Sequence, residues 1–117
     1  MPFGKELILD LHDCQRPFDR ATIHQFFIDL CRLIKMRREK IAWWDYPETG
    51  KDYDKLRGLS AVQFIRTSSI TVHALDASHR LYVNVFSCKP FSASKAAAFT
   101  AAYFQGKIVG RKVVKRR

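Results

Sequence analysis

Apolar positions along this chain follow two periods, and each period predicts a different kind of element. Residues 5–14, KELILDLHDC, form a short apolar run of the length expected for a buried strand. Residues 19–38 instead place apolar side chains three and four positions apart, as one face of a helix requires, and Asp19 is a suitable N-cap. The helix is expected to bury Ile23, Phe26, Phe27, Leu30, Leu33 and Ile34.

The rest of the chain predicts five more strands and a second helix. Strands are expected at residues 40–47, 59–67, 69–76, 79–88 and 107–114. An alanine-rich helix at residues 93–105 has Ser92 as its N-cap, and Gly106 has the backbone freedom to end it. The order β-α-β-β-β-β-α-β, with antiparallel neighbouring strands and both helices on one face, predicts an α+β fold built as a two-layer sandwich.

Between Pro47 and Gly58 the pattern is interrupted by a polar segment. Its sequence, PETGKDYDKLRG, contains charges of both signs and one isolated aromatic residue, Tyr53. Loops of this length inside a compact domain commonly bind ligands or cover a site. We therefore expect a binding loop or a lid here.

Length and composition predict one folded domain over residues 1–117. The hydrophobic content of 47% excludes a disordered composition, and a chain of 117 residues is too short for two independent cores. No apolar run approaches the roughly 18 residues needed to cross a bilayer, and the start lacks the pattern of a signal peptide. We expect a cytoplasmic protein without a membrane segment.

The net charge of +10 favours anionic partners. Cations concentrate in residues 32–40, where they suit the end of a helix, and in residues 107–117, which contain no acidic residue. No aromatic RNA-binding signature, KH loop or zinc-finger spacing accompanies this charge. Nucleic-acid binding through the basic tail therefore has no support beyond charge.

The three cysteines exclude two common frameworks. Cys14, Cys31 and Cys88 are odd in number and widely spaced, without a C-x-x-C pair. Neither a set of disulfides nor a zinc site is expected from them, and we predict no metal. Most cysteines of this kind are small buried hydrophobic residues.

One set of spacings suggests specific chemistry. Ser68 opens an apolar run, His73 follows five residues later, Cys88 ends the segment VNVFSC twenty residues after the serine, and Ser60 precedes it by eight in GLSA. Taken alone, Ser68 would be an ordinary turn residue, His73 an ordinary core or surface histidine of a strand, and Cys88 an unreactive packing residue. Together, with the opening GKELILDLHDC, they make the chain resemble the prokaryotic S-adenosylmethionine decarboxylases, which are self-cleaving, pyruvoyl-dependent proenzymes.

The resemblance implies a role for each residue. Cleavage would fall between Thr67 and Ser68, and Ser68 would become the pyruvoyl cofactor that accepts electrons during decarboxylation. His73 would be the processing base, Cys88 the proton donor and Ser60 an aid to cleavage. The family also implies a lyase that acts on S-adenosylmethionine in the synthesis of spermidine and other polyamines, and a homodimer.

Several positions depart from the family pattern. The residue before the processed serine, usually glutamate, is Thr67, and the histidine after that serine is replaced by Ser69. The aromatic residue that stacks on adenine aligns with Asp54, one place from Tyr53, and the ribose-binding carboxylate is displaced by one place to Asp76. Most departures concern nucleoside recognition. We therefore expect Tyr53 and Asp76 to bind substrate and allow for a different amino acid as substrate.

The strand register gives partial support to this grouping. A turn centred on Ser78 would place Ser68 opposite Cys88 and His73 opposite Val83. In an extended strand His73 would lie on the other face, about 16 Å from Ser68, at about 3.3 Å per residue. A bulge between the two would be required to bring them together.

Two alternatives of other classes stay open. The chain could be an unprocessed, inactive relative of the family that acts as a binding or regulatory protein. It could also be a basic nucleic-acid-binding module, with Trp43, Trp44 and Tyr46 as stacking surfaces beside the basic end of the first helix.

Overall fold

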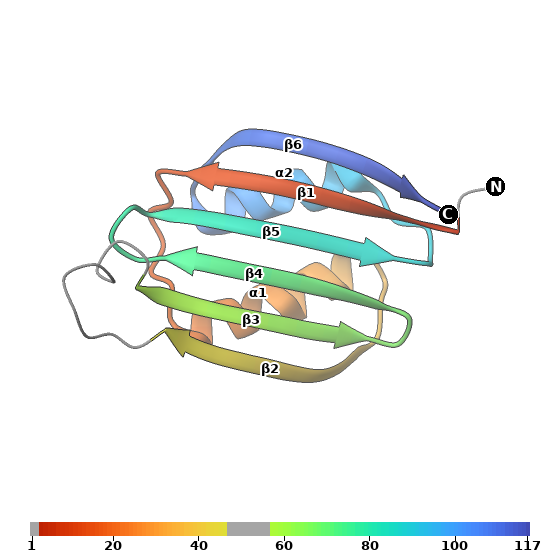
Figure 1. The fold of residues 1–117 in the computed structure, drawn as a ribbon, viewed down its shortest axis with the longest axis horizontal. Coiled ribbons are helices and arrows are strands. Elements are labelled where there is room, and N and C mark those ends of the chain that lie inside the picture. Colours follow the sequence, from red (N-terminus) through yellow and green to blue (C-terminus); the bar gives the residue numbers. More distant parts are fainter. Residues whose placement is uncertain (1–2, 47–56) are drawn as a thin grey trace.

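A computed structural model of the chain describes residues 3–46 and 57–117. Six strands and two helices follow one another in the predicted order (Figure 1). The strands are β1 (Gly4–His12), β2 (Arg38–Tyr46), β3 (Gly58–Ile65), β4 (Ser68–Leu75), β5 (Arg80–Ser87) and β6 (Lys107–Arg116). The helices are α1 (Arg20–Leu33) and α2 (Ala93–Phe104).

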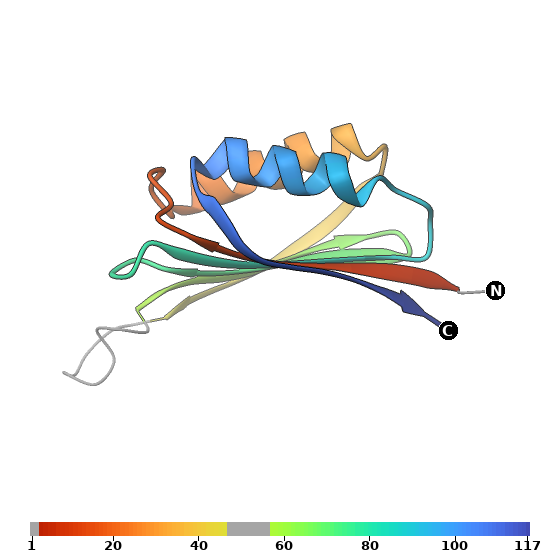
Figure 2. The same ribbon diagram turned by 90° about the horizontal axis from the view of Figure 1, so that it is seen from above.

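The strands form one antiparallel sheet in the order β2-β3-β4-β5-β1-β6. Both helices lie on the same side of the sheet, which confirms the predicted two-layer α+β fold (Figure 2). The other side of the sheet, here called the open face, is covered by no helix of the described chain. Its side chains include Trp44, Ser60, Phe64, His73 and Tyr82.

The core fills the space between the sheet and the helices. Leu81, Val83 and Val85 of β5 point toward the helices and are buried, as their alternation with polar and aromatic neighbours predicted. Phe26 of α1 and Phe104 of α2 meet across the helix pair with ring centroids 4.8 Å apart. Burial of these large apolar side chains is the main stabilising contribution to the fold.

Helix α1 ends five residues earlier than predicted. Lys35 adopts a positive φ of 58°, and the N–H of Met36 donates to the C=O of Cys31 at 2.8 Å, which closes the helix end. The chain then extends into β2, so most cations of residues 32–40 lie beyond the helix rather than at its C-terminus. Leu33, which was expected to be buried, is 40% exposed.

Helix α2 begins as predicted but ends differently. The Oγ of Ser92 accepts the N–H of Lys95 at 3.2 Å, which confirms the N-cap. At the other end Gln105, not Gly106, adopts the left-handed conformation, with φ 52° and ψ 47°. Gly106 is required for space instead, because a Cβ at this position would lie 2.7 Å from the Sγ of Cys14.

The turn between β4 and β5 occupies residues 76–79 and is not centred on Ser78. His79 closes it with a positive φ of 53°, and its N–H donates to the C=O of Asp76 at 3.4 Å. Because the turn length sets the cross-strand pairs, the hairpin is shifted by one residue from the predicted register.

This shift changes the partners of both candidate residues in β4. Ser68 pairs with Ser87 rather than with Cys88, and His73 pairs with Tyr82 rather than with Val83. From Ser68 to Leu75, β4 pairs with β3 and β5 without a register shift. The bulge that would bring His73 to Ser68 is therefore not part of the fold.

Residues 3–46 and 57–117 contain neither of two common features, a metal site and a membrane-spanning helix. These residues contain no group of three or more His, Cys, Asp or Glu side chains that could hold a metal ion. They also contain no helix that is long and apolar enough to cross a membrane.

Candidate functional site

Ser68 lies where the hairpin of β3 and β4 turns. Only Arg66 and Thr67 connect the two strands, so the peptide bond between Thr67 and Ser68 is the last bond of the turn. Ser68 is partly buried, and its Oγ donates to the Oγ of Ser87 at 2.8 Å. The same Ser87 oxygen accepts the backbone N–H of Lys89 at 2.8 Å. These two bonds hold the Ser68 hydroxyl in one orientation.

A cavity of about 220 Å³ opens beside this hairpin turn. Both residues of the bond in question, Thr67 and Ser68, line it. The other lining residues are Met36, Arg37, Ile65, Arg66 and Lys89. The cavity is large enough for a small polar molecule to approach the bond and carries three cationic side chains.

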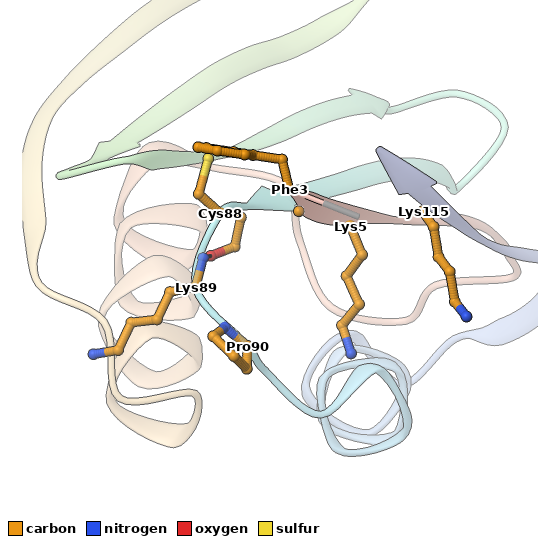
Figure 3. Close-up of a pocket in the computed structure, with 8 residues that line it drawn as sticks. Phe3, Lys5, Cys88, Lys89, Pro90 and Lys115 are labelled. Atoms are coloured by element: carbon orange, nitrogen blue, oxygen red, sulfur yellow. Dashed lines mark hydrogen bonds between the residues drawn. The ribbon is translucent and has the colours of Figure 1, made fainter. Parts of the chain in front are cut away.

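Cys88 follows directly after β5 and lines a second cavity, also of about 220 Å³ (Figure 3). Lys89 lines both cavities, so they adjoin each other just after the end of β5. Burial raises the pKa of both other thiols, Cys14 and Cys31, to about 11. Cys88 is the exposed cysteine and therefore the one that a substrate can reach.

Ser60 and His73 form a second pair, on the open face. They are register partners in β3 and β4, and the Ser60 Oγ and His73 Nδ1 are 2.7 Å apart, a hydrogen-bonding distance. Trp44 and Tyr82 pair with them from the strands on either side, so the four residues form one row across the sheet. The row gives the open face a polar centre bordered by aromatic rings.

The structure therefore brings Ser60 and His73 together as a pair on the open face. Ser68 and Cys88 both adjoin Ser87 at one end of the sheet, but they line different cavities, and the Cys88 thiol points away from the helices, toward Phe3 (Figure 3). The side chain of Ser68 points to the helix side and that of His73 to the opposite side, because they are five residues apart in a regular strand. Within one chain, His73 does not reach the bond before Ser68.

Of the two residues expected to bind substrate, the structure describes Asp76, which lies away from Ser68. Tyr53 lies outside the described residues. Asp76 follows β4 at the end opposite Ser68, and its N–H donates to the C=O of Arg57 at 3.0 Å. Partial burial raises the pKa of the Asp76 carboxyl, and the nearby charges of Arg57 and His79 oppose this rise.

Ser87 is the residue that sequence reasoning missed. The assumed turn centre moved the whole hairpin by one residue and placed Cys88 where Ser87 lies. The signal that could have identified Ser87 is the turn sequence DASH, whose four residues fit a turn closed by a left-handed residue.

Comparisons with known proteins address the family directly. The family model described as S-adenosylmethionine decarboxylase matches residues 5–117. This chain belongs to the S-adenosylmethionine decarboxylase family. The resemblance predicted from Ser60, Ser68, His73 and Cys88 is thereby confirmed at the level of the family. S-adenosylmethionine decarboxylases of this family are lyases that use a pyruvoyl group made from one of their own serines.

A solved structure shows the same fold. The crystal structure of the adenosylmethionine decarboxylase from Aquifex aeolicus VF5 matches with a TM-score of 0.79 and 16% sequence identity. The match covers 98% of this chain and 91% of that one. No curated protein sequence matches the chain significantly.

The residues around Ser68 fit the pyruvoyl group of the S-adenosylmethionine decarboxylases. Making that group requires a serine hydroxyl close to the carbonyl before it, and Ser68 is held at the end of a two-residue turn. The group also needs room for a substrate, which the cavity lined by Thr67 and Ser68 offers. Cys88, a side chain of a type that can donate a proton, lines the adjoining cavity.

Proposed function

We propose that this chain is a self-processing, pyruvoyl-dependent decarboxylase that acts on S-adenosylmethionine or a related amino acid in polyamine synthesis. The proposal rests on the position of Ser68 in a chain that belongs to a family of such enzymes. Its hydroxyl lies at the last bond of a hairpin turn, hydrogen-bonded to Ser87 and open to a cavity.

Processing begins with the Ser68 hydroxyl. Its Oγ attacks the carbonyl carbon of Thr67, the C–N bond breaks, and the nitrogen takes up the hydroxyl proton, which leaves an ester. Ser87 accepts the hydrogen bond of that hydroxyl at 2.8 Å and can relay its proton on the way to the nitrogen. Because the N–H of Lys89 occupies another lone pair of the Ser87 oxygen, this acceptor is fixed in position.

The second half of processing needs a base. Removal of the α-proton of residue 68 expels the Thr67 carboxylate, and hydrolysis of the resulting dehydroalanine releases ammonia and leaves the new N-terminal keto group. When present, that pyruvoyl group supplies an electron sink for the departure of carbon dioxide. Cys88, directly after β5, is the residue proposed to return a proton to the substrate carbon.

The base comes from a second copy of the chain. His73 is the residue proposed for this role, yet within one chain it lies on the opposite face from Ser68. The open face exposes Trp44 and Phe64 by 65% and 48%, so it offers apolar area for a homodimer. Packing there would place the Ser60–His73 pair of one chain against the open face of its partner, from which the base would have to reach the α-proton of residue 68, since the Ser68 hydroxyl points to the helix side.

Mass measurement under denaturing conditions tests the proposal. Matured wild-type protein should separate into residues 1–67 and residues 68–117, with the second fragment blocked at its N-terminus. Ser68→Ala should remain one full-length species, because it lacks the attacking oxygen. Fragments from that variant, or an intact wild-type chain after prolonged incubation, would overturn the proposal.

Mixing two inactive variants tests the role of the second copy. Ser68→Ala cannot be cleaved but keeps His73, whereas His73→Ala keeps the bond but loses the base. When the two variants are co-expressed, His73→Ala chains should be cleaved in mixed dimers. The cleaved fraction of His73→Ala chains should not exceed the fraction of them that have a Ser68→Ala partner. If no His73→Ala chain is cleaved in such mixtures, His73 does not act across the dimer.

A second candidate function is an unprocessed relative that binds without catalysis. The separation of His73 from Ser68 within the chain and the presence of Thr67 in place of glutamate favour it. An intact mass for the wild type, together with measurable binding of S-adenosylmethionine, would identify this alternative.

A further inference from the structure

The proposed processing creates a carboxylate that the chain does not contain before cleavage. In the ester that joins Thr67 to Ser68, the base removes the α-proton of residue 68 and a double bond forms between its Cα and Cβ. The Cβ–Oγ bond breaks, and its electron pair stays on the oxygen, which becomes part of the Thr67 carboxylate. One negative charge therefore develops at Thr67 during this elimination and remains there as the new chain end.

The cavity beside this bond is lined by cationic residues. Thr67 and Ser68 both line it, and so do Arg37, Arg66 and Lys89. The three cations come from three separate segments, which are the connection between α1 and β2, the turn between β3 and β4, and the connection between β5 and α2. No carboxylate of residues 3–46 and 57–117 lines this cavity. The charge around the bond is thus positive on several sides.

Lys89 is the cation whose position the structure defines best. Its backbone N–H donates at 2.8 Å to the Oγ of Ser87, the same oxygen that accepts the Ser68 hydroxyl. Its Nζ donates to the C=O of Lys35 at 3.4 Å. In Figure 3 this side chain extends toward α1, away from the two lysines of the cavity that is drawn. The ammonium group therefore lies beside the segment that leads to Arg37.

These positive charges have no carboxylate partner in the part of the chain that the structure describes. None of the ion pairs among residues 3–46 and 57–117 includes Arg37, Arg66 or Lys89. The Lys89 ammonium has three N–H donors, and its acceptor among the same residues is the neutral carbonyl of Lys35. Its remaining donors are available to an oxyanion that forms at the neighbouring bond.

We propose that Lys89, together with Arg37 and Arg66, binds the Thr67 carboxylate as it forms and thereby accelerates the elimination step of processing. The proposal rests on the proposed function, since it names the residues that stabilise the leaving group of that reaction. A cation beside the developing charge stabilises the transition state more than the neutral ester that precedes it. After cleavage, the same charge-assisted contacts hold the new chain end in the cavity.

Lys89→Met tests the proposal, because it removes the ammonium group but keeps the backbone N–H that holds Ser87. The variant should form the ester as the wild type does and complete cleavage about tenfold more slowly, as expected for one lost charge-assisted hydrogen bond. The ester should therefore accumulate. Mild hydroxylamine under denaturing conditions measures it, since this reagent cuts the ester and releases residues 68–117 with a free N-terminal serine, whereas completed processing leaves that end blocked.

Three further variants control for charge, fold and position. Lys115→Met removes one positive charge from the adjoining cavity, which Ser68 does not line, and should change the cleavage rate less than about twofold, because distant charges are screened. Lys89→Arg keeps the charge and should recover most of the rate. Arg37→Met changes another wall of the same cavity and should also slow cleavage and raise the ester fraction.

The outcomes separate this proposal from the proposed function. Cleavage of Lys89→Met at the wild-type rate, or equal losses in Lys89→Met and Lys115→Met, would overturn the assignment to the leaving carboxylate. Slow cleavage without accumulated ester would also overturn it, because a displaced Ser68 hydroxyl would have that effect. A wild-type chain that stays intact and yields no fragment with hydroxylamine would instead overturn the proposed function, and this proposal with it.

Discussion

Asp19 shows how one side chain can make a helix sensitive to pH. Its Oδ1 accepts the N–H of Thr22 at 2.7 Å, and this hydrogen bond lowers the pKa of the carboxyl below its ordinary value of 3.8. A carboxyl with a lowered pKa stabilises the fold at every pH above its unfolded value. This contribution is lost as the pH falls through the folded value.

Replacement of Asp19 should therefore matter less in acid. Asp19→Ala should lower the free energy of unfolding by about 1 kcal/mol at pH 7, and the difference from wild type should shrink below about pH 4. Urea denaturation at pH 7 and pH 3 measures both values. Asp19→Asn, which caps without titrating, should keep the stability at pH 7, and an equal loss for Asp19→Ala at both pH values would contradict this account.

The residues of the candidate site could be predicted from the sequence, but which of them lie close together could not. Ser60, Ser68, His73 and Cys88 were identified by spacing alone. Which of them meet depends on strand partners and on the face that each side chain takes. Ser87 became visible only when the partner of Ser68 was known.

The register of a hairpin is decided in its turn. Alternation identified β4 and β5 and leaves the choice between registers two residues apart to the turn, whereas the predicted register, one residue off, would have set the buried Ile70 opposite Phe86 rather than Val85 and so put the apolar positions of the two strands on different faces. Here His79 determines the pairing by adopting a left-handed backbone that non-glycine residues rarely take. The ends of the two helices are closed in the same way, because Lys35 after α1 and Gln105 after α2 also adopt the left-handed conformation.

His79→Gly should consequently stabilise the protein. Glycine adopts positive φ without the cost that a Cβ imposes, so we expect a gain of up to about 1 kcal/mol. Ser78→Gly is the matched change one position earlier, where φ is not positive, and it should be neutral or destabilising. Thermal unfolding of the two variants compares them, and a loss in His79→Gly would argue against the described turn.

The end of α2 depends on space rather than on backbone freedom. Gly106→Ala should destabilise the fold by about 1–3 kcal/mol, because the new Cβ would meet the buried Sγ of Cys14. In the double variant with Cys14→Ala, part of this loss should be recovered. Strict additivity of the two changes in denaturant unfolding would show that the sulfur is not the obstacle.

For the whole molecule, the pattern of apolar positions was enough to predict the layers. Amphipathic helices and alternating strands have one solution in which all apolar faces meet, and the chain adopts it. The order of strands was not predictable in the same way. The placement of β1 between β5 and β6 brings Lys5 beside Lys115, and residues so distant in sequence give no local signal.

The exposed aromatic side chains of the open face should hold two chains together. Phe64→Asp should convert a homodimer into monomers and, if His73 acts across the dimer, also prevent cleavage. Leu33→Asp is the control, because Leu33 is 40% exposed on α1, on the other side of the sheet. Size-exclusion chromatography with light scattering measures the mass, and an unchanged mass for Phe64→Asp would exclude this face as the interface.

The position of β1 has a further consequence for a chain cut before Ser68. The N-terminal piece would contain β1 to β3 and the C-terminal piece β4 to β6, yet β1 lies between two strands of the other piece. Their separation would require three sheet boundaries to open at once, namely β3–β4, β5–β1 and β1–β6. The cut protein would thus keep its hydrodynamic size and its sheet. Two halves synthesised from separate genes should assemble into the same interleaved body.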